Sequence, residues 1–380
     1  MSLRAALRLA RQPALSLALC GMAIGTFAAT MPDLKARAGT SDGETGIALI
    51  AAAVGGMSAM HFGPAFARAT GGRVLPAAAL VGAAAVLAPL LGTGPLMLIP
   101  ALMLFGAGAS LLDIVANLVV SEIERRERRS LMNVAHACYS FGFAGAALAA
   151  SAARGAGFGP AAILPVAAAL ICLCALSQPR GPGPQRASGP AGPKVALPMA
   201  AVLPAGLIVF AAIMGENATE AWTALHIERT LGAPHGAGSL GPTLFGLTMG
   251  LARLAAQVIS GRVSEARLVG GSCLIAVAGV TAVALAPTPL VAMAGVVASG
   301  AGLAVAVPSA ISMLGVRVTD AQRPLAISRA LTLGYAGFFV GPSVIGLVAE
   351  LAGLRAAFLA VALTVALALP AARALARIRP

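Results

Sequence analysis

Apolar residues dominate this chain in long runs, and short polar or Gly/Pro-rich segments separate the runs. A helix needs roughly 20 apolar residues to cross a bilayer, and most of the runs reach that length. The polar segments between them are too short to form a soluble domain. The pattern predicts an all-α membrane protein with twelve transmembrane helices, at residues 13–32, 44–66, 74–92, 95–120, 130–152, 158–176, 198–222, 240–260, 268–287, 289–315, 325–350 and 354–376.

One longer polar segment interrupts the pattern near its middle. Residues 177–194, SQPRGPGPQRASGPAGPK, are rich in Pro and Gly and have no apolar periodicity, which predicts a flexible linker. The expected organisation is an N-terminal six-helix bundle at 1–176, a cytoplasmic linker at 177–197 and a C-terminal six-helix bundle at 198–380. In both parts the second span follows a short polar loop and ends at a basic one, which is typical of transporters with internal repeats. We therefore expect two pseudo-symmetric bundles.

Lys and Arg are distributed unevenly between the two sides of the predicted membrane. The side with both termini and the linker carries 20 of the 26 basic residues, the other side carries five, and Arg253 lies within a span. Because basic residues concentrate on cytoplasmic loops, both termini are expected in the cytoplasm. The basic N-terminus and first apolar run resemble a signal peptide, but the run is long enough to span and more spans follow. We expect a retained first helix and a multi-pass protein of the bacterial inner (plasma) membrane.

Composition supports the membrane assignment and excludes several other classes. The chain is 59% hydrophobic and 10% charged, with a mean hydropathy of +0.91, whereas a soluble domain needs more polar surface. Its net charge of +13 lies in short clusters between apolar runs, without the aromatic-interleaved basic face of a nucleic-acid-binding protein. The five cysteines fall in apolar segments without metal-ligand spacing, so we expect small buried side chains and no metal.

The segment DIVAN places the first charged side chain inside a predicted span. Asp113 and Asn117 are four residues apart and therefore share one helix face. A charge in the hydrocarbon region is costly and usually faces a cavity or a partner. Since a carboxyl group removed from water holds its proton more strongly, Asp113 is a candidate for proton coupling. The alternative is a structural hydrogen bond to a neighbouring helix.

The following span begins with a second polar group, MNVAHACYSFG. Asn133, His136 and Tyr139 repeat at helical spacing and share a face. Asp113 and His136 lie at similar distances from the connecting loop, so in an antiparallel hairpin they would meet and could relay a proton. The alternative for His136 is a packing role.

Two further groups place charges in the second half of the chain. In GENATEAW, Glu216 and Glu220 share a helix face, with Asn217 beside them. Glu216 is expected at a cavity, whereas Glu220 and the adjacent Trp could instead mark the membrane interface. Arg253 lies deep in its span and requires a carboxylate, either Glu216 or Glu220 on the preceding helix or Glu265 near the cytoplasmic end.

Motifs of soluble enzymes are missing from the sequence. It has no phosphate-binding loop, HExxH metal pair, GxSxG elbow or dinucleotide fingerprint. We therefore expect no enzymatic activity and no cofactor.

The layout and two loop motifs resemble the major facilitator superfamily over essentially the whole chain. GPAFARATGGR at 63–73 is similar to the family's signature between spans two and three, with Ala67 where the family usually has an acidic residue. GRVSEAR at 261–267 is similar to its counterpart in the second half. The resemblance implies the major facilitator fold and gate loops at Gly63, Arg68, Arg73, Gly261, Arg262, Glu265 and Arg267.

Within that superfamily, DIVAN and MNVAHACYSFG resemble the branch that contains the L-fucose:proton symporter and uncharacterised bacterial relatives. This resemblance implies that Asp113 takes part in proton coupling and that His136 and Tyr139 line the solute cavity. A sugar substrate does not follow, because one Trp and two Tyr supply few stacking surfaces. GYAGFFVGPSVIG at 334–346 resembles an antiporter Gly-Pro motif, but it lies on span eleven rather than span five.

The favoured function is secondary active transport of a small polar or amphipathic solute by alternating access, in symport with protons, by a monomer embedded in the lipid bilayer. One alternative is a proton-driven exporter of hydrophobic or drug-like compounds, and another is a non-transporting membrane sensor or assembly factor. Asp113 and His136 are the expected proton-coupling residues. The expected substrate-binding residues are Asn117, Asn133, Tyr139, Glu216, Asn217, Glu220 and Arg253.

Overall fold

The computed structural model describes residues 3–127, 131–179, 197–259, 263–319 and 322–378. The first seven α-helices are α1 (Leu3–Leu9), α2 (Arg11–Ala38), α3 (Asp42–Thr70), α4 (Val74–Leu87), α5 (Pro95–Glu127), α6 (Met132–Gly155) and α7 (Pro160–Leu176). The next eight are α8 (Met199–Leu225), α9 (Leu240–Ile259), α10 (Glu265–Leu285), α11 (Pro289–Leu303), α12 (Ala306–Gly315), α13 (Arg323–Tyr335), α14 (Gly337–Ala366) and α15 (Ala368–Arg377). The short elements are η1 (Gly71–Arg73), η2 (Ala88–Leu91), the π-helix η3 (His226–Thr230) and η4 (Ala237–Ser239).

The described residues form the predicted all-helical membrane architecture. By length and composition, nine of their helices can cross a bilayer, and α7 adds a shorter apolar helix. The long α14 contains the boundary predicted between the last two spans. There Gly353 has φ 82° and ψ 166°, a conformation that glycine adopts without the steric cost of a Cβ atom. The two remaining predicted spans correspond to α9 and to α13 with the start of α14. With these, the described helices account for the twelve predicted spans.

Three details of the helices were not predicted from the sequence. The predicted loop at 67–73 is mostly helical, because α3 continues to Thr70 and turns only at Gly71, where φ is 54°. The tenth span is interrupted between α11 and α12, and the eleventh between α13 and α14. Apolar periodicity continues through these interruptions, so the sequence pattern gives no signal for them.

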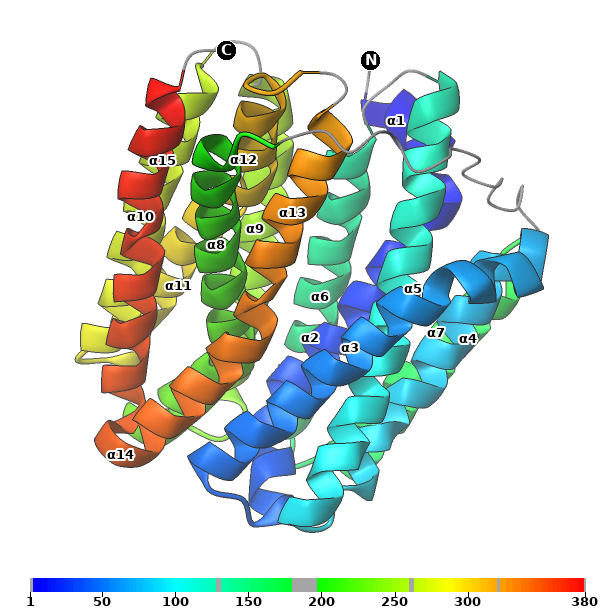
Figure 1. The fold of residues 1–380 in the computed structure, drawn as a ribbon. Helices are drawn as coiled ribbons and strands as arrows, with labels where there is room; N and C mark the ends of the chain where they lie inside the picture. The colour runs from blue at the N-terminus through cyan, green and yellow to red at the C-terminus, as the bar shows by residue number, and fades with distance from the viewer. Residues whose placement is uncertain (1–2, 128–130, 180–196, 260–262, 320–321, 379–380) are drawn as a thin grey trace.

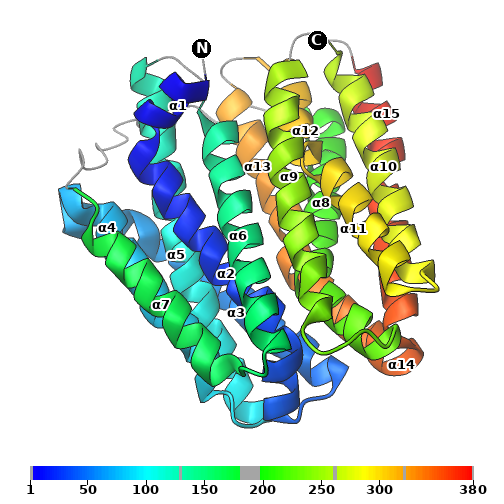
Figure 2. The same cartoon turned by 180° about the vertical axis from the view of Figure 1, so that it is seen from behind.

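The helices form two groups, which we call the N-terminal half (α1–α7) and the C-terminal half (α8–α15). Both chain termini lie at the same end of the molecule, which we call the terminal end, and we call the opposite end the distal end (Figures 1 and 2). The predicted linker at 177–197 falls almost entirely outside the described residues. Across the interface, α6 packs against α9, α3 against α14 and α2 against α8.

Small residues allow helices within the N-terminal half to approach closely. A Cβ atom added to Gly21 of α2 would lie 2.0 Å from the Tyr139 carbonyl oxygen of α6. One added to Gly142 of α6 would lie 2.1 Å from the Ala18 carbonyl oxygen of α2. The two backbones are therefore in direct contact, as small-residue pairs permit in membrane helices. This contact fixes the position of α6, which carries several of the candidate site residues.

Candidate functional site: the central cavity between the two halves

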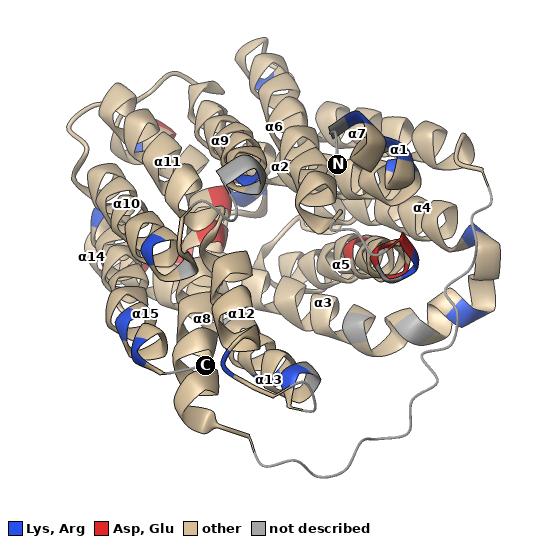
Figure 3. Ribbon diagram, turned by 90° about the horizontal axis from the view of Figure 1, so that it is seen from above, with Lys and Arg blue, Asp and Glu red and all other residues tan. Residues whose placement is uncertain are grey.

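A cavity of about 310 Å³ lies between the two halves of the molecule. Its lining comes from α2, α3, α5 and α6 of the N-terminal half and from α8, α9 and α14 of the C-terminal half. Two larger hollows, of about 550 and 410 Å³, lie within the N-terminal half, and their described linings contain no charged side chain. In the view onto the terminal end, acidic positions gather where α8 and α9 face the N-terminal half (Figure 3). Charge thus identifies the smaller, central cavity as the candidate site.

The cavity brings together most of the polar residues singled out from the sequence. Those that line it are Asp113, His136, Tyr139, Glu216, Asn217, Glu220 and Arg253. Asn117 and Asn133 are half-buried and stand outside this lining. Helical periodicity predicted the shared faces, and the packing of α5, α6, α8 and α9 around one space joins those faces.

The structure places His136 against Asn117, one helical turn after Asp113, in place of the predicted contact with Asp113. The Asn117 amide donates to the main-chain carbonyl oxygen of Asp113 at 3.0 Å, and its Oδ1 lies 3.0 Å from His136 Nε2. Because an amide oxygen only accepts, His136 Nε2 must carry the hydrogen in this arrangement. The physical reason for the difference is packing: α6 lies mainly against α2 and α9 rather than forming a tight hairpin with α5. Asn117 then bridges the space that remains.

Arg253 links the two halves across the cavity. Its Nη1 donates to Ser140 Oγ of α6 at 2.8 Å, and its Nη2 lies 3.5 Å from Glu216 Oε1 of α8. The Ser140 hydroxyl in turn donates to the His136 carbonyl oxygen at 3.1 Å. Of the carboxylates considered from the sequence, Glu216 is thus the one in ion-pair contact with Arg253. The Glu265 side chain lies outside the described part of the structure.

Carboxyl groups outnumber guanidinium groups around this space. Asp113, Glu216 and Glu220 line the cavity together with Arg253, which interacts electrostatically with all three. Glu220 therefore belongs to the cavity and not to the membrane interface. The membrane-interface alternative for Trp222 is wrong as well, since its side chain is 1% exposed within the core.

An aromatic part of the lining was not predicted. The Phe27 and Phe105 ring centroids lie 4.5 Å apart, and both residues line the cavity, as does Phe338 of α14. Phenylalanines in apolar runs give no sequence signal that separates a cavity wall from a packed core or a lipid-facing surface. Only the positions of α2, α5 and α14 around the cavity identify them.

The proposed gate-loop residues lie away from the cavity. Gly63 is buried within α3, and Arg68 and Arg73 are exposed at the end of that helix and in η1. In the second motif, Arg267 lies in the first turn of α10, where its Nε donates to Ser264 Oγ at 3.1 Å. Gly261 and Arg262 fall outside the described residues, as does the Glu265 side chain. A gating role for either motif stays a prediction.

Comparison with known proteins addresses the family. Residues 205–380 match the profile described as Major Facilitator Superfamily. An uncharacterised MFS-type transporter of Yersinia pestis is 28% identical over 364 residues, covering 94% of each chain. The C-terminal part of the chain is thus similar to the Major Facilitator Superfamily, and nearly the whole chain is similar to a protein named as an MFS-type transporter.

Solved structures of membrane transporters share the fold at low sequence identity. A bacterial homologue of the human lysosomal transporter Spinster, in an inward-facing and occupied conformation, has a TM-score of 0.74 at 14% identity, covering 98% of this chain and 97% of that one. The fucose:proton symporter of E. coli has a TM-score of 0.59 at 16% identity, covering 97% and 98%. The shared fold agrees with the predicted arrangement of twelve helices in two bundles.

Proposed function

We propose that the chain is a major facilitator transporter that moves a small polar or amphipathic solute in symport with protons by alternating access. The observation that carries the proposal is the central cavity, which a carboxyl group of one half and an ion pair of the other half line together. Asp113 lies on α5 of the N-terminal half, and Arg253 with Glu216 lies on α9 and α8 of the C-terminal half. Transporters of this type bind their solute between the two repeats, near the middle of the membrane.

The hydrogen-bonded connection provides a route by which solute binding and proton binding affect each other. Asn117 joins the main-chain carbonyl of Asp113 to the His136 ring, and Ser140 joins the main-chain carbonyl of His136 to Arg253. A solute that takes the Arg253 guanidinium away from Ser140 releases one end of this chain. The Asp113 environment changes in turn, because Asn117 is held between Asp113 and His136. Asp113 carries the proton. His136 either positions Asn117 or receives the proton from Asp113 through water.

The lining also limits the solute. A volume of about 310 Å³ admits a small molecule and excludes a large lipid or peptide. Three carboxyl groups favour hydrogen-bond donors or positive charge, and the Phe27, Phe105 and Phe338 side chains accommodate an apolar part. An amphipathic solute with a donor-rich end satisfies both sets of contacts.

Location and assembly follow from the sequence. The proposed orientation places the termini and the linker in the cytoplasm and the distal end outside a bacterial plasma membrane, since basic residues favour the cytoplasmic side. The cavity is complete within one chain, which supports transport by a monomer. Proton coupling is supported by the fold that the chain shares with the fucose:proton symporter, and by no closer likeness to that protein.

Solute-dependent proton movement tests this function directly. Purified protein in liposomes that contain a pH-sensitive dye is given sugars, organic acids, amino acids and cationic compounds in turn. We expect solutes of one of these classes to acidify the lumen with wild-type protein, because symport carries protons inward with the added solute, and we expect Asp113→Asn to lose this effect. Glu122→Gln, which changes a carboxylate on the same helix near its terminal end, is the matched control and should behave as wild type. Equal proton movement in wild type and Asp113→Asn would contradict the assignment of Asp113.

A second candidate is a proton-driven exporter of hydrophobic compounds. The aromatic and aliphatic portion of the cavity lining favours it. A proton gradient directed into the liposomes separates the two candidates. It drives the solute into the lumen if the protein is a symporter, and out of the lumen if the protein is a proton-driven exporter.

A further inference from the structure

We propose that reversible ion pairs between the two halves close the distal end, and we call each of these contacts a latch. In each latch, a charged side chain that binds the other half also has a partner in its own half. The proposal concerns the conformational equilibrium of the empty protein. It therefore does not depend on which solute or ion is carried.

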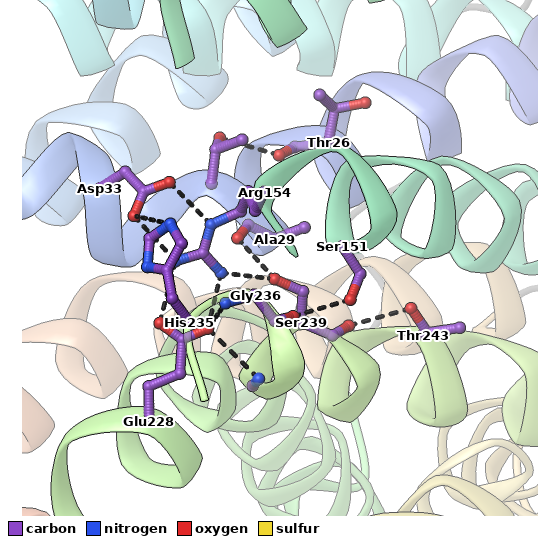
Figure 4. A network of polar contacts seen from close by, with 12 residues as sticks. Thr26, Ala29, Asp33, Ser151, Arg154, Glu228, His235, Gly236, Ser239 and Thr243 are labelled. Atoms are coloured by element: carbon purple, nitrogen blue, oxygen red, sulfur yellow. Dashed lines mark hydrogen bonds and ion pairs between the residues drawn. The ribbon is translucent and has the colours of Figure 1, made fainter. Parts of the chain in front are cut away.

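The first latch is centred on Arg154, at the distal end of α6. Its guanidinium is completely buried and donates to both oxygens of Asp33 on α2, at 2.7 and 2.8 Å. It also donates to both oxygens of Glu228 in η3, at 2.7 and 2.9 Å (Figure 4). Asp33 belongs to the same half as Arg154, whereas Glu228 belongs to the other half. One arginine thus holds a carboxylate from each half.

Glu228 has a second set of partners within the C-terminal half. Its Oε1 accepts hydrogen bonds from the backbone N–H groups of Gly236 and Gly238, at 3.1 and 3.2 Å. If the halves separate at this end, Arg154 keeps Asp33 and Glu228 keeps these two donors. Leaving a buried charge without a partner is the most costly way to break an ion pair, and this arrangement avoids it.

A second latch nearby has the same construction. Arg229 of η3 forms a bidentate ion pair with Asp42 at the start of α3, across the interface. Asp42 is also 3.3 Å from Lys35 Nζ of its own half, and the Arg229 side chain is 46% exposed. On separation, Lys35 stays with Asp42 and Arg229 enters water. The π-helical turn of η3 places Glu228 and Arg229, neighbours in sequence, on two different partners.

Neighbouring contacts indicate that both latches are closed in this structure. Ser151 Oγ of α6 donates to the Gly236 carbonyl oxygen at 2.7 Å, and Ser239 Oγ donates to the Ala29 carbonyl oxygen at 2.9 Å (Figure 4). Both hydrogen bonds join the two halves. At the terminal end, by comparison, Arg317 Nε donates to the Ile378 carbonyl oxygen within the C-terminal half. The geometry therefore corresponds to the state whose distal end is shut.

Because Arg154 and Glu228 each have a second partner in their own half, the proposal predicts in which direction each substitution shifts the equilibrium between the closed and open distal end. Simple structural ion pairs would not predict this. Glu228→Gln removes a charge that binds Arg154 across the interface and favours opening. Asp33 Oδ1 also lies 3.7 Å from His235 Nε2 of the other half, so Asp33→Asn is made in a His235→Ala background and compared with His235→Ala alone. In that background Asp33→Asn removes the partner that Arg154 needs when the halves separate, so it makes opening more costly and favours the closed state. The two substitutions remove one carboxylate each from the same arginine, yet they should shift the equilibrium in opposite directions.

Hydrogen–deuterium exchange of the full-length protein in nanodiscs, without solute, measures this equilibrium. We expect Glu228→Gln to raise the exchange rate of amides in residues 151–158 and 236–240 by about tenfold, because a charge-assisted contact is lost. Asp33→Asn should lower the rate in the same peptides below that of His235→Ala alone. Glu122→Gln at the terminal end serves as the control and should change neither peptide.

A shift in the same direction for Glu228→Gln and Asp33→Asn would overturn the proposal. If either variant fails to fold, the second latch provides the same test. Arg229→Gln should favour opening, and Lys35→Met, which leaves Asp42 dependent on Arg229, should favour the closed state. Opening by Lys35→Met would likewise refute the proposal.

Discussion

At the scale of the residue, Arg253 contributes the contact that joins the cavity lining of the two halves. A guanidinium presents several N–H groups in a fixed plane, so Arg253 reaches Ser140 with one nitrogen and Glu216 with another. A lysine ammonium is a single point on a flexible chain and satisfies one of these partners at a time. The sequence predicted that Arg253 needs a carboxylate, but the contact with Ser140 required the structure.

Arg253→Lys should therefore reduce solute transport although the positive charge remains. The expected loss is about tenfold, because one hydrogen bond to a charged group contributes about 1.5–3 kcal/mol. Initial rates of tracer uptake into liposomes measure it. Arg373→Lys, at an exposed arginine of α15, is the matched control and should retain wild-type rates. Unchanged uptake in Arg253→Lys would show that the bridge to Ser140 is dispensable.

At the scale of the element, the close contact of α2 with α6 determines where α6 presents His136 and Ser140. Small residues in membrane helices are common, so the sequence indicated that close packing was possible without identifying the partner helix. The structure places Gly142 against the α2 backbone, whereas a Cβ added to Gly145, on the same helix, meets no atom within 4 Å. Two glycines of one helix thus differ completely in what they permit.

Gly142→Ala should destabilise the protein by about 1–3 kcal/mol, since the new methyl group must push two backbones apart. Gly145→Ala is the matched control and should be neutral or stabilising by up to about 1 kcal/mol, because alanine favours the helix. Thermal unfolding of the detergent-solubilised variants measures both. Equal unfolding temperatures would indicate that α2 and α6 can separate without cost.

At the scale of the whole molecule, the two halves are expected to move as rigid bodies about the cavity. The Arg154 and Arg229 latches lie at the same end and join the same halves. Opening one latch by a rigid-body rotation therefore opens the other. Two contacts broken in a single transition contribute separately to one equilibrium.

The double variant Glu228→Gln with Arg229→Gln should accordingly raise the open-state exchange rate above that of either single variant. Exchange of residues 151–158 measures the three variants against wild type. An effect equal to the larger single value would mean that each latch opens locally, without movement of the halves.

The sequence by itself determined the membrane class, the approximate positions of the spans and the helix faces that carry the charged residues. These properties depend on local quantities, namely the length of an apolar run and the spacing of residues along one helix. Asp113, His136, Tyr139, Glu216 and Arg253 were found because a charge or polar group inside an apolar run is conspicuous. The family resemblance rests on loop motifs of the same local kind.

Only the tertiary structure decided which of these faces meet. It placed Asn117 between Asp113 and His136, added phenylalanines to the cavity wall and joined Arg154 to Asp33 and Glu228. In the sequence, those last three charges lie near predicted span ends, where charged residues are ordinary. Their pairing depends on the packing of α2, α6 and η3 from two halves of the chain, which residue spacing along one helix cannot encode.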